Sequence, residues 1–303
     1  MTQHAYGVRS SVGTLERVAV RRPLTGGPEV VAQYEAAHWQ TPDLDRLAAQ
    51  HAGFVQTLRN LGSEVVELDP VEGLPDAVFV YDPAFVIPSG TVVFQAAKKA
   101  RVGEGDHLAA GLEQAGVPTI GRLVGDATAD AGDMFWLDED TVAIGRGYRT
   151  NQAAIDQMRG ILASDGVAVE QFDLPHDMGP EYCLHLMSVI SPVRENLAVV
   201  YERLAPVAML QSLARRGIEW VTVDDEEYAT LGCNILAVRP GVVVMGQRNV
   251  RTADKLREFG TANFVGAHCT GMEAVFHLRQ RLGLPRRSCV VGAVGATFDL
   301  GEG

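Results

Sequence analysis

Apolar residues recur at the three-to-four-residue spacing of an amphipathic helix in five separate stretches of the chain. In each stretch a glycine ends the helical pattern, and a short apolar run follows. Because glycine readily adopts the left-handed conformation that ends many helices, each stretch predicts a helix, a turn and a strand. The stretches are 44–68, 105–123, 152–174, 206–223 and 252–266.

Segments with two apolar runs around a polar turn lie between these stretches. Their turns contain Pro-Ser-Gly, Asp-Glu-Asp, Pro-Val-Arg-Glu-Asn and Arg-Pro-Gly, so each segment predicts a pair of strands joined by a turn. The segments are 77–95, 133–148, 185–201 and 234–249. A further apolar strand at 15–23 has no partner before it, and we expect it to complete a fifth unit with the end of the chain.

The resulting order of strand, strand, helix and strand repeats about five times. Such repeats favour an α/β fold in which units surround an axis and a site lies at the centre, a five-fold pseudosymmetric α/β propeller with an atypical last unit. An ordinary open α/β sheet is the alternative. The chain has no linker rich in Pro, Gly or Ser, so we predict one propeller domain over 1–262. We expect an atypical segment, 263–303, to pack on the same domain.

Composition narrows the classes of partner. The chain has 303 residues, 47% of them hydrophobic, and a formal net charge of −12, which argues against nucleic acid and suits small cationic ligands. No apolar run reaches the length of a membrane span, and the first residues lack the apolar core of a signal peptide. The four cysteines are far apart, which is typical of reduced cytosolic thiols, and we predict a cytoplasmic protein.

Polar residues gather at the ends of the predicted strands. Taken singly, each has a structural explanation: a carboxylate in a turn, an arginine paired across a hairpin, or a histidine satisfied in the core. Taken together, they form a candidate site for a planar cation, because carboxylates bind guanidinium through paired hydrogen bonds. A nearby thiolate could attack the guanidinium carbon, with histidine as acid and base. The clusters are Asp76 and Asp82, Asp130 and Asp133, Arg149 and Asn151, and His185.

At these residues the chain, over roughly 8–260, resembles the guanidino-group-modifying (pentein) superfamily: dimethylarginine dimethylaminohydrolases, arginine deiminases and amidinotransferases. Their fold has five ββαβ units. The resemblance implies that the segment "PDAVFVYDP" binds substrate, with Asp82 on the guanidinium and Asp76 on a more distal part of the ligand, and that Phe79 is also a substrate-binding residue. It further implies that Arg149, in "GYRTN", binds the substrate carboxylate.

The same resemblance supplies the catalytic assignments. "DAGD" stands where the family usually has Glu-Gly-Gly-Asp, so Asp130 replaces the catalytic glutamate, and "LHLMS" gives His185 as the catalytic histidine. Cys233, in "GCNILAV", is expected to be structural. Tyr81 stands where dimethylarginine hydrolases have a second acid, and Met187 favours that branch over deiminases. The branch's second arginine has no clear match in "VVFQAAKKAR".

The C-terminal segment departs furthest from the family. "VGAHCTGMEAV" matches the family's Gly-rich nucleophile loop only loosely, and we rank Cys269 as the nucleophile ahead of Cys289, whose strand could pair with 15–23 to close the ring. The segment also resembles the C-terminal end of metallo-β-lactamase-fold hydrolases. The upstream His-x-His-x-Asp-His cluster that such a metal site needs is not in the sequence, so no metal is predicted.

We therefore predict a cofactor-independent hydrolase of the guanidino C–N bond of arginine or a methylated arginine, with a citrulline-type product. Cys269, His185 and Asp130 are the predicted catalytic residues. The predicted partner is a small guanidino substrate, without nucleic acid or membrane, and a homodimer is the candidate assembly. The alternatives are an amidinotransferase, in which an amine replaces water, and a non-catalytic arginine-binding relative.

Overall fold

The computed structural model of the chain describes residues 6–37, 39, 43–260, 263–267 and 289–291. These residues form five sheets that follow one another along the sequence. No helix within these ranges is long and apolar enough to cross a membrane.

Three of the sheets share one plan. Each begins with an antiparallel pair of strands, and the second strand of the pair then pairs in parallel with a third strand. The strands are β3 (Ala84–Ile87), β4 (Gly90–Val93), β5 (Thr119–Arg122), β6 (Met134–Asp138), β7 (Thr141–Arg146), β8 (Ala168–Asp173), β9 (Ile190–Arg194), β10 (Leu197–Val200) and β11 (Glu219–Thr222).

A helix joins the two parallel strands in each unit, as the spacing of apolar residues predicts. The helices that have this role in the five sheets are α2 (Leu44–Asn60), α3 (Glu104–Gln114), α4 (Gln152–Ala163), α6 (Val207–Arg215) and α8 (Val250–Glu258). The glycine after each helix has a positive φ, between +67° and +96°, which confirms the predicted left-handed helix ends. The glycines are Gly62, Gly116, Gly166, Gly217 and Gly260.

The two remaining sheets differ from this plan. β12 (Ile235–Arg239), β13 (Val242–Gly246) and β14 (Asn263–Ala267) repeat it, and β15 (Cys289–Val291) adds a fourth strand parallel to β14. Among the described residues, β1 (Arg17–Arg21) pairs with β2 (Glu64–Leu68) alone, in parallel. The expectation that the strand at Cys289 would pair with the N-terminal strand is therefore wrong, because β15 extends the sheet of β14 instead.

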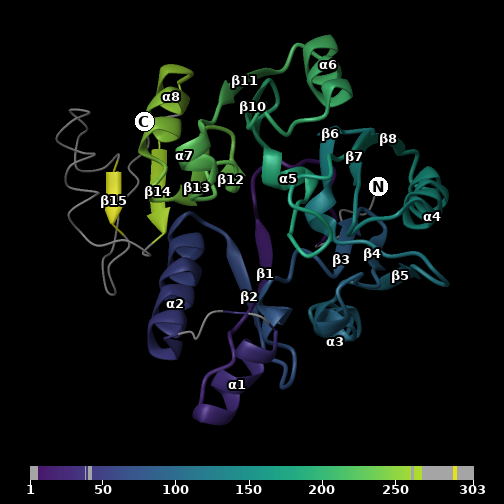
Figure 1. Cartoon of the computed structure of the whole chain (residues 1–303), viewed down its shortest axis with the longest axis vertical. Coiled ribbons are helices and arrows are strands. Elements are labelled where there is room, and N and C mark those ends of the chain that lie inside the picture. Colours follow the sequence, from purple (N-terminus) through teal and green to yellow (C-terminus); the bar gives the residue numbers. More distant parts are fainter. Residues whose placement is uncertain (1–5, 38, 40–42, 261–262, 268–288, 292–303) are drawn as a thin grey trace.

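The sheets surround a central region, with α2, α3, α4, α6 and α8 outside them (Figure 1). Apolar side chains fill the space between sheets and outer helices; one cluster joins Val92, Ile144 and Met158, all fully buried. The remaining described helices are α1 (Pro28–Ala36), α5 (Leu186–Val189), α7 (Asp225–Tyr228) and the 3₁₀ helices η1 (Pro75–Val78), η2 (Lys99–Arg101) and η3 (Ala131–Asp133).

The segment before β3 corrects one sequence-based prediction. The apolar run that begins at Ala77 was expected to be a strand that ends at Asp82. The structure instead has η1 followed by a turn, and Asp82 lies just before β3. Pro75 at the start of η1 supplies a preset helical φ, which favours this turn over an extended strand. The three 3₁₀ helices and α5 carry most of the candidate site.

Candidate active site

The backbone at Gly132, in η3, brings two predicted site residues together. Its N–H donates a hydrogen bond to Asp82 Oδ1 at 3.2 Å, and the N–H of Ala131 donates to the carbonyl of Asp82 at 2.9 Å. A Cβ atom at position 132 would lie 2.4 Å from His185 Nδ1 and 3.0 Å from Asp82 Oδ1. The glycine of "DAGD" therefore lets a carboxylate and an imidazole pack against the same peptide.

His185 lies against Asp130 in a buried position. Its Nε2 is 3.2 Å from Asp130 Oδ2, and the side chain of Asp130 is 2% exposed. Burial opposes the positive charge, but the Asp130 carboxylate, the Cys183 contact and the charges of Asp133 and Asp82 outweigh it and raise the pKa of His185 well above its usual range. His185 is thus held in the protonated form, the form needed by a general acid.

Asp133 anchors the loops that carry these groups. It is fully buried; its Oδ1 accepts from the N–H of Leu186 at 2.8 Å and its Oδ2 from Thr150 Oγ1 at 2.6 Å. Burial raises the pKa of Asp133 to about 6, against the opposing effect of His185 and these two hydrogen bonds. The side chain therefore joins η3, the start of α5 and the loop after β7 into one framework.

Asp82 forms an ion pair that the sequence did not predict. Arg101 Nη1 donates a hydrogen bond to Asp82 Oδ2 at 2.7 Å. Its Nη2 and Nε both donate to Oε2 of the buried Glu104 carboxylate, at 2.7 Å and 3.0 Å. The Asp82–Arg101–Glu104 triad carries a net charge of −1. Each oxygen of Asp82 accepts only one described hydrogen bond from protein and keeps a lone pair for a ligand donor. From the sequence, the three-residue separation of Arg101 and Glu104 could have predicted their ion pair, but not the contact of Arg101 with Asp82.

Asp76, expected to contact a distal part of the ligand, is already bound within the protein. It is 4% exposed; Lys98 Nζ donates to its Oδ2 at 2.8 Å and Trp39 Nε1 to its Oδ1 at 2.5 Å. Phe79 is half exposed and its ring stacks on Trp39, with centroids 5.8 Å apart. Tyr81, at the position of a second acid in the family, donates its hydroxyl to the carbonyl of Met134 at 3.0 Å.

Arg149 is a buried cation with no acidic partner among the residues that the structure describes. It is 9% exposed, and its Nε is buried without a hydrogen-bond partner. Its neighbour Thr150 contacts Asp133, so Arg149 belongs to the loop that adjoins the Asp130–His185 pair. A buried guanidinium without a counterion is costly, and a ligand carboxylate would satisfy it. Asn151 caps α4 instead, accepting from Ala154 at 2.9 Å.

The cysteines divide into three cases. Cys269 lies outside the described residues, and of Cys289 only the backbone, in β15, is described. Cys233 is buried in an apolar cluster, and burial raises the pKa of its thiol to about 12, in keeping with a structural role. Cys183 is exposed, with its Sγ 3.8 Å from both ring nitrogens of His185. Equal distances place the sulfur off the lone-pair direction of either nitrogen, a poor geometry for proton transfer.

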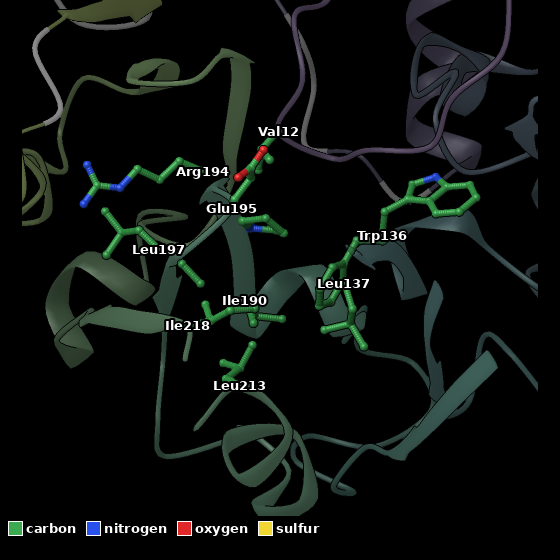
Figure 2. Close-up of a pocket in the computed structure, with 12 residues that line it drawn as sticks. Val12, Trp136, Leu137, Ile190, Arg194, Glu195, Leu197, Leu213 and Ile218 are labelled. Atoms are coloured by element: carbon green, nitrogen blue, oxygen red, sulfur yellow. The ribbon is translucent and has the colours of Figure 1, made fainter. Parts of the chain in front are cut away.

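A small hollow of about 30 Å³ lies elsewhere, between β6 and β9. Figure 2 shows Leu137, Ile190 and Leu213 around it, while the guanidinium of Arg194 points away. None of its lining residues belongs to the Asp82–Asp130–His185 cluster. Within the described ranges, no group of three or more His, Cys, Asp or Glu is arranged to hold a metal ion.

The profile of the family described as N,N-dimethylarginine dimethylhydrolase, eukaryotic, matches residues 38–256 of the chain. The chain belongs to this family. One similar protein is YkgA of Bacillus subtilis, which is 27% identical over 82% of this chain and 85% of the relative. The N(G),N(G)-dimethylarginine dimethylaminohydrolase of Streptomyces coelicolor is 26% identical over 81% of the chain and 87% of the relative.

Solved structures with the same fold include a mutant of the dimethylarginine dimethylaminohydrolase of Pseudomonas aeruginosa in complex with citrulline. It is 22% identical, with a TM-score of 0.67 over 82% of this chain and 90% of that one. The N-terminal domain of ArgZ, a cyanobacterial arginine dihydrolase, bound to its product, is 20% identical, with a TM-score of 0.67 over 80% and 88% of the two chains. These likenesses confirm the predicted pentein-type α/β fold.

Family membership also confirms the assignment to hydrolases of guanidino C–N bonds, related to dimethylargininases and arginine deiminases, at the level of the family. The family match ends before the C-terminal segment. The resemblance of that segment to metallo-β-lactamase-fold hydrolases stays a prediction.

Proposed function

We propose that the protein hydrolyses the guanidino C–N bond of an arginine-type compound and releases an amine and a ureido, citrulline-type product. The observation that carries the proposal is the convergence of Asp82, Asp130 and His185 around Gly132, where a guanidinium would meet carboxylates on one side and a protonated imidazole on the other. Arg149, which has no acidic partner within the described residues and whose Nε has no hydrogen-bond partner there, suits a substrate that ends in a carboxylate.

Each side chain has one role in this reaction. Asp82 holds the substrate guanidinium while a cysteine thiolate, which we assign to Cys269, attacks its central carbon and forms a tetrahedral adduct. His185 gives its proton to the departing amine as the C–N bond breaks, leaving an S-linked amidinium on the enzyme. The neutral His185 then takes a proton from water, and the resulting hydroxide attacks the same carbon. As the C–S bond breaks, the added hydroxyl loses its proton to solvent, where the released amine takes it up, and the ureido product and the free thiolate form.

Asp130 orients His185 and stabilises the imidazolium through the 3.2 Å contact to Nε2. Because the carboxylate favours the charged ring, the histidine is ready to donate a proton in the first half of the reaction. Asp133 and Thr150 hold the loop that carries Asp130 and do not contact the reacting atoms in this proposal.

Besides Cys289, the alternative that the sequence offered, the structure adds Cys183 as a candidate nucleophile, because its sulfur is 3.8 Å from the ring nitrogens of His185. Its off-axis approach to both nitrogens favours Cys269, which belongs to the segment where the repeat pattern expects the nucleophile. A comparison of serine variants separates the two assignments.

The test is release of a ureido product from arginine, from Nω-methylated arginines and from arginine analogues that keep the carboxylate. We expect turnover by the unmodified protein, loss with Cys269→Ser, and retention with Cys183→Ser and with the buried control Cys233→Ser. Loss with Cys183→Ser alone would move the nucleophile to the loop before α5. Tight binding without turnover of any compound would contradict the hydrolase and favour a ligand-binding relative.

A further inference from the structure

Two short segments of the chain form adjacent ion pairs at the candidate site. Residues 76–82 supply Asp76 and Asp82, and residues 98–101 supply Lys98 and Arg101 as their partners. Backbone hydrogen bonds hold both segments in shape: Phe79 donates to Asp76 and accepts from Asp82, at 3.0 and 3.3 Å, and Arg101 donates to Lys98 at 2.9 Å. Asp76, the acid nearest in sequence to Asp82, is thus held beside Lys98.

The two ion pairs differ in net charge. Arg101 is shared between Asp82 and the buried Glu104, so that triad stays negative and can attract a substrate cation. Lys98 has one acidic partner, Asp76, and donates otherwise to the carbonyl of Ala37 at 3.2 Å. The Asp76–Lys98 pair is therefore neutral, and both oxygens of Asp76 already accept a hydrogen bond.

These charges discriminate between ligand groups. A guanidinium is attracted to the negative triad, and a carboxylate is attracted to Arg149, which has no acidic partner in the part of the chain that the structure describes. An ammonium group at Asp76 would lie beside the ammonium of Lys98, whose charge cancels the attraction of the carboxylate. It would leave water without an ionic partner, which is unfavourable. In the described part of segments 76–82 and 98–104, every acid already has a cationic partner.

We propose that Lys98 makes this site select guanidino carboxylic acids that lack a free α-ammonium group. The inference rests on the proposed hydrolase function and narrows its substrate class. The preferred substrate carries a guanidinium for Asp82 and a carboxylate for Arg149, with hydrogen or a neutral substituent where arginine has its amine. Lys98 is a specificity-determining residue in this account, and Asp76 serves to fix its position.

The experiment compares two substrates of equal chain length, 5-guanidinopentanoate and arginine, which differ only by the α-ammonium. Because an ammonium that leaves water without an ionic partner costs more free energy than a tenfold change in affinity, we expect kcat/KM to favour 5-guanidinopentanoate by at least about tenfold. Lys98→Met should reduce that preference by about tenfold or more by improving arginine, and Lys98→Arg should keep it. Lys99→Met is the matched control, since Lys99 is exposed and adjacent, and it should leave the ratio unchanged.

The outcomes are distinguishable. The inference would be overturned if the unmodified protein preferred arginine, or if Lys98→Met left the ratio of the two kcat/KM values unchanged. Either result would leave the proposed hydrolase function standing. Failure to convert either compound would overturn the proposed function instead. In that case, calorimetric titration with the same two compounds still decides whether the site rejects the α-ammonium. If Lys98→Met does not fold, the ratio measured on the unmodified protein decides alone.

Discussion

Substitution of Gly132 by alanine should disable the site while leaving the fold in place. The added Cβ would lie 2.4 Å from His185 Nδ1, 2.9 Å from its Cγ and 3.0 Å from Asp82 Oδ1. Since comfortable contacts between such atoms are about 3.5 Å, the imidazole must move by about 1 Å. A shift of about 1 Å at a reacting group costs on the order of 100-fold in rate, and local overpacking costs about 1–3 kcal/mol of stability.

The assay is kcat for release of the ureido product, with the free energy of unfolding measured in urea on the same samples. The matched control is Gly160→Ala in α4, where a Cβ would meet nothing within 4 Å. That variant should keep its kcat and gain up to about 1 kcal/mol of stability from helix propensity. An unchanged kcat in Gly132→Ala would refute the claim that His185 and Asp82 must share the space over this glycine.

Three further results are expected. Arg101→Met should lower the free energy of unfolding by about 3–5 kcal/mol, because it leaves Asp82 and a second carboxylate buried without their cation; unchanged urea unfolding would contradict this. The rate should fall as pH rises through the raised pKa of His185, and Asp130→Asn should lower that pKa and move the alkaline limb of the pH profile to lower pH. Thr150→Val, compared with Thr150→Ser, should cost about 1–3 kcal/mol in thermal unfolding, since a buried carboxylate loses its donor.

The same histidine links stability to pH. Because the folded state raises the pKa of His185 above its ordinary value of 6.5, its contribution to stability is complete below that value. The contribution is lost as the pH rises through the folded-state pKa. A stability profile that stays flat across that window would indicate that the Asp130 contact is weak in solution.

The helices were the most predictable part of the fold. Their apolar periodicity and terminal glycines are local signals, and α2, α3, α4, α6 and α8 all form where those signals lie. The segment 77–82 was less predictable because a short apolar run does not distinguish a strand from a turn. Pro75, at the start of η1, favours the helical turn that the structure has there.

Site residues were predictable where a motif carries them along the sequence, as for Asp130 and His185. Arg101 and Lys98 escaped detection because their partners, Asp82 and Asp76, are 19 and 22 residues away in the chain. These charges come together where η2 and the residue before it contact η1 and the turn that follows η1. The Trp39 contact to Asp76 was missed for the same reason.

The central claim is that the Asp82–Asp130–His185 cluster acts with a cysteine thiolate on a guanidino carbon. The most direct measurement is acid quenching during turnover, followed by mass spectrometry of the protein and its peptides. The account predicts a covalent adduct with the mass of the S-linked amidinium, on the peptide that contains Cys269 and absent from Cys269→Ser. Turnover without any cysteine adduct, or an adduct on Cys183, would contradict it.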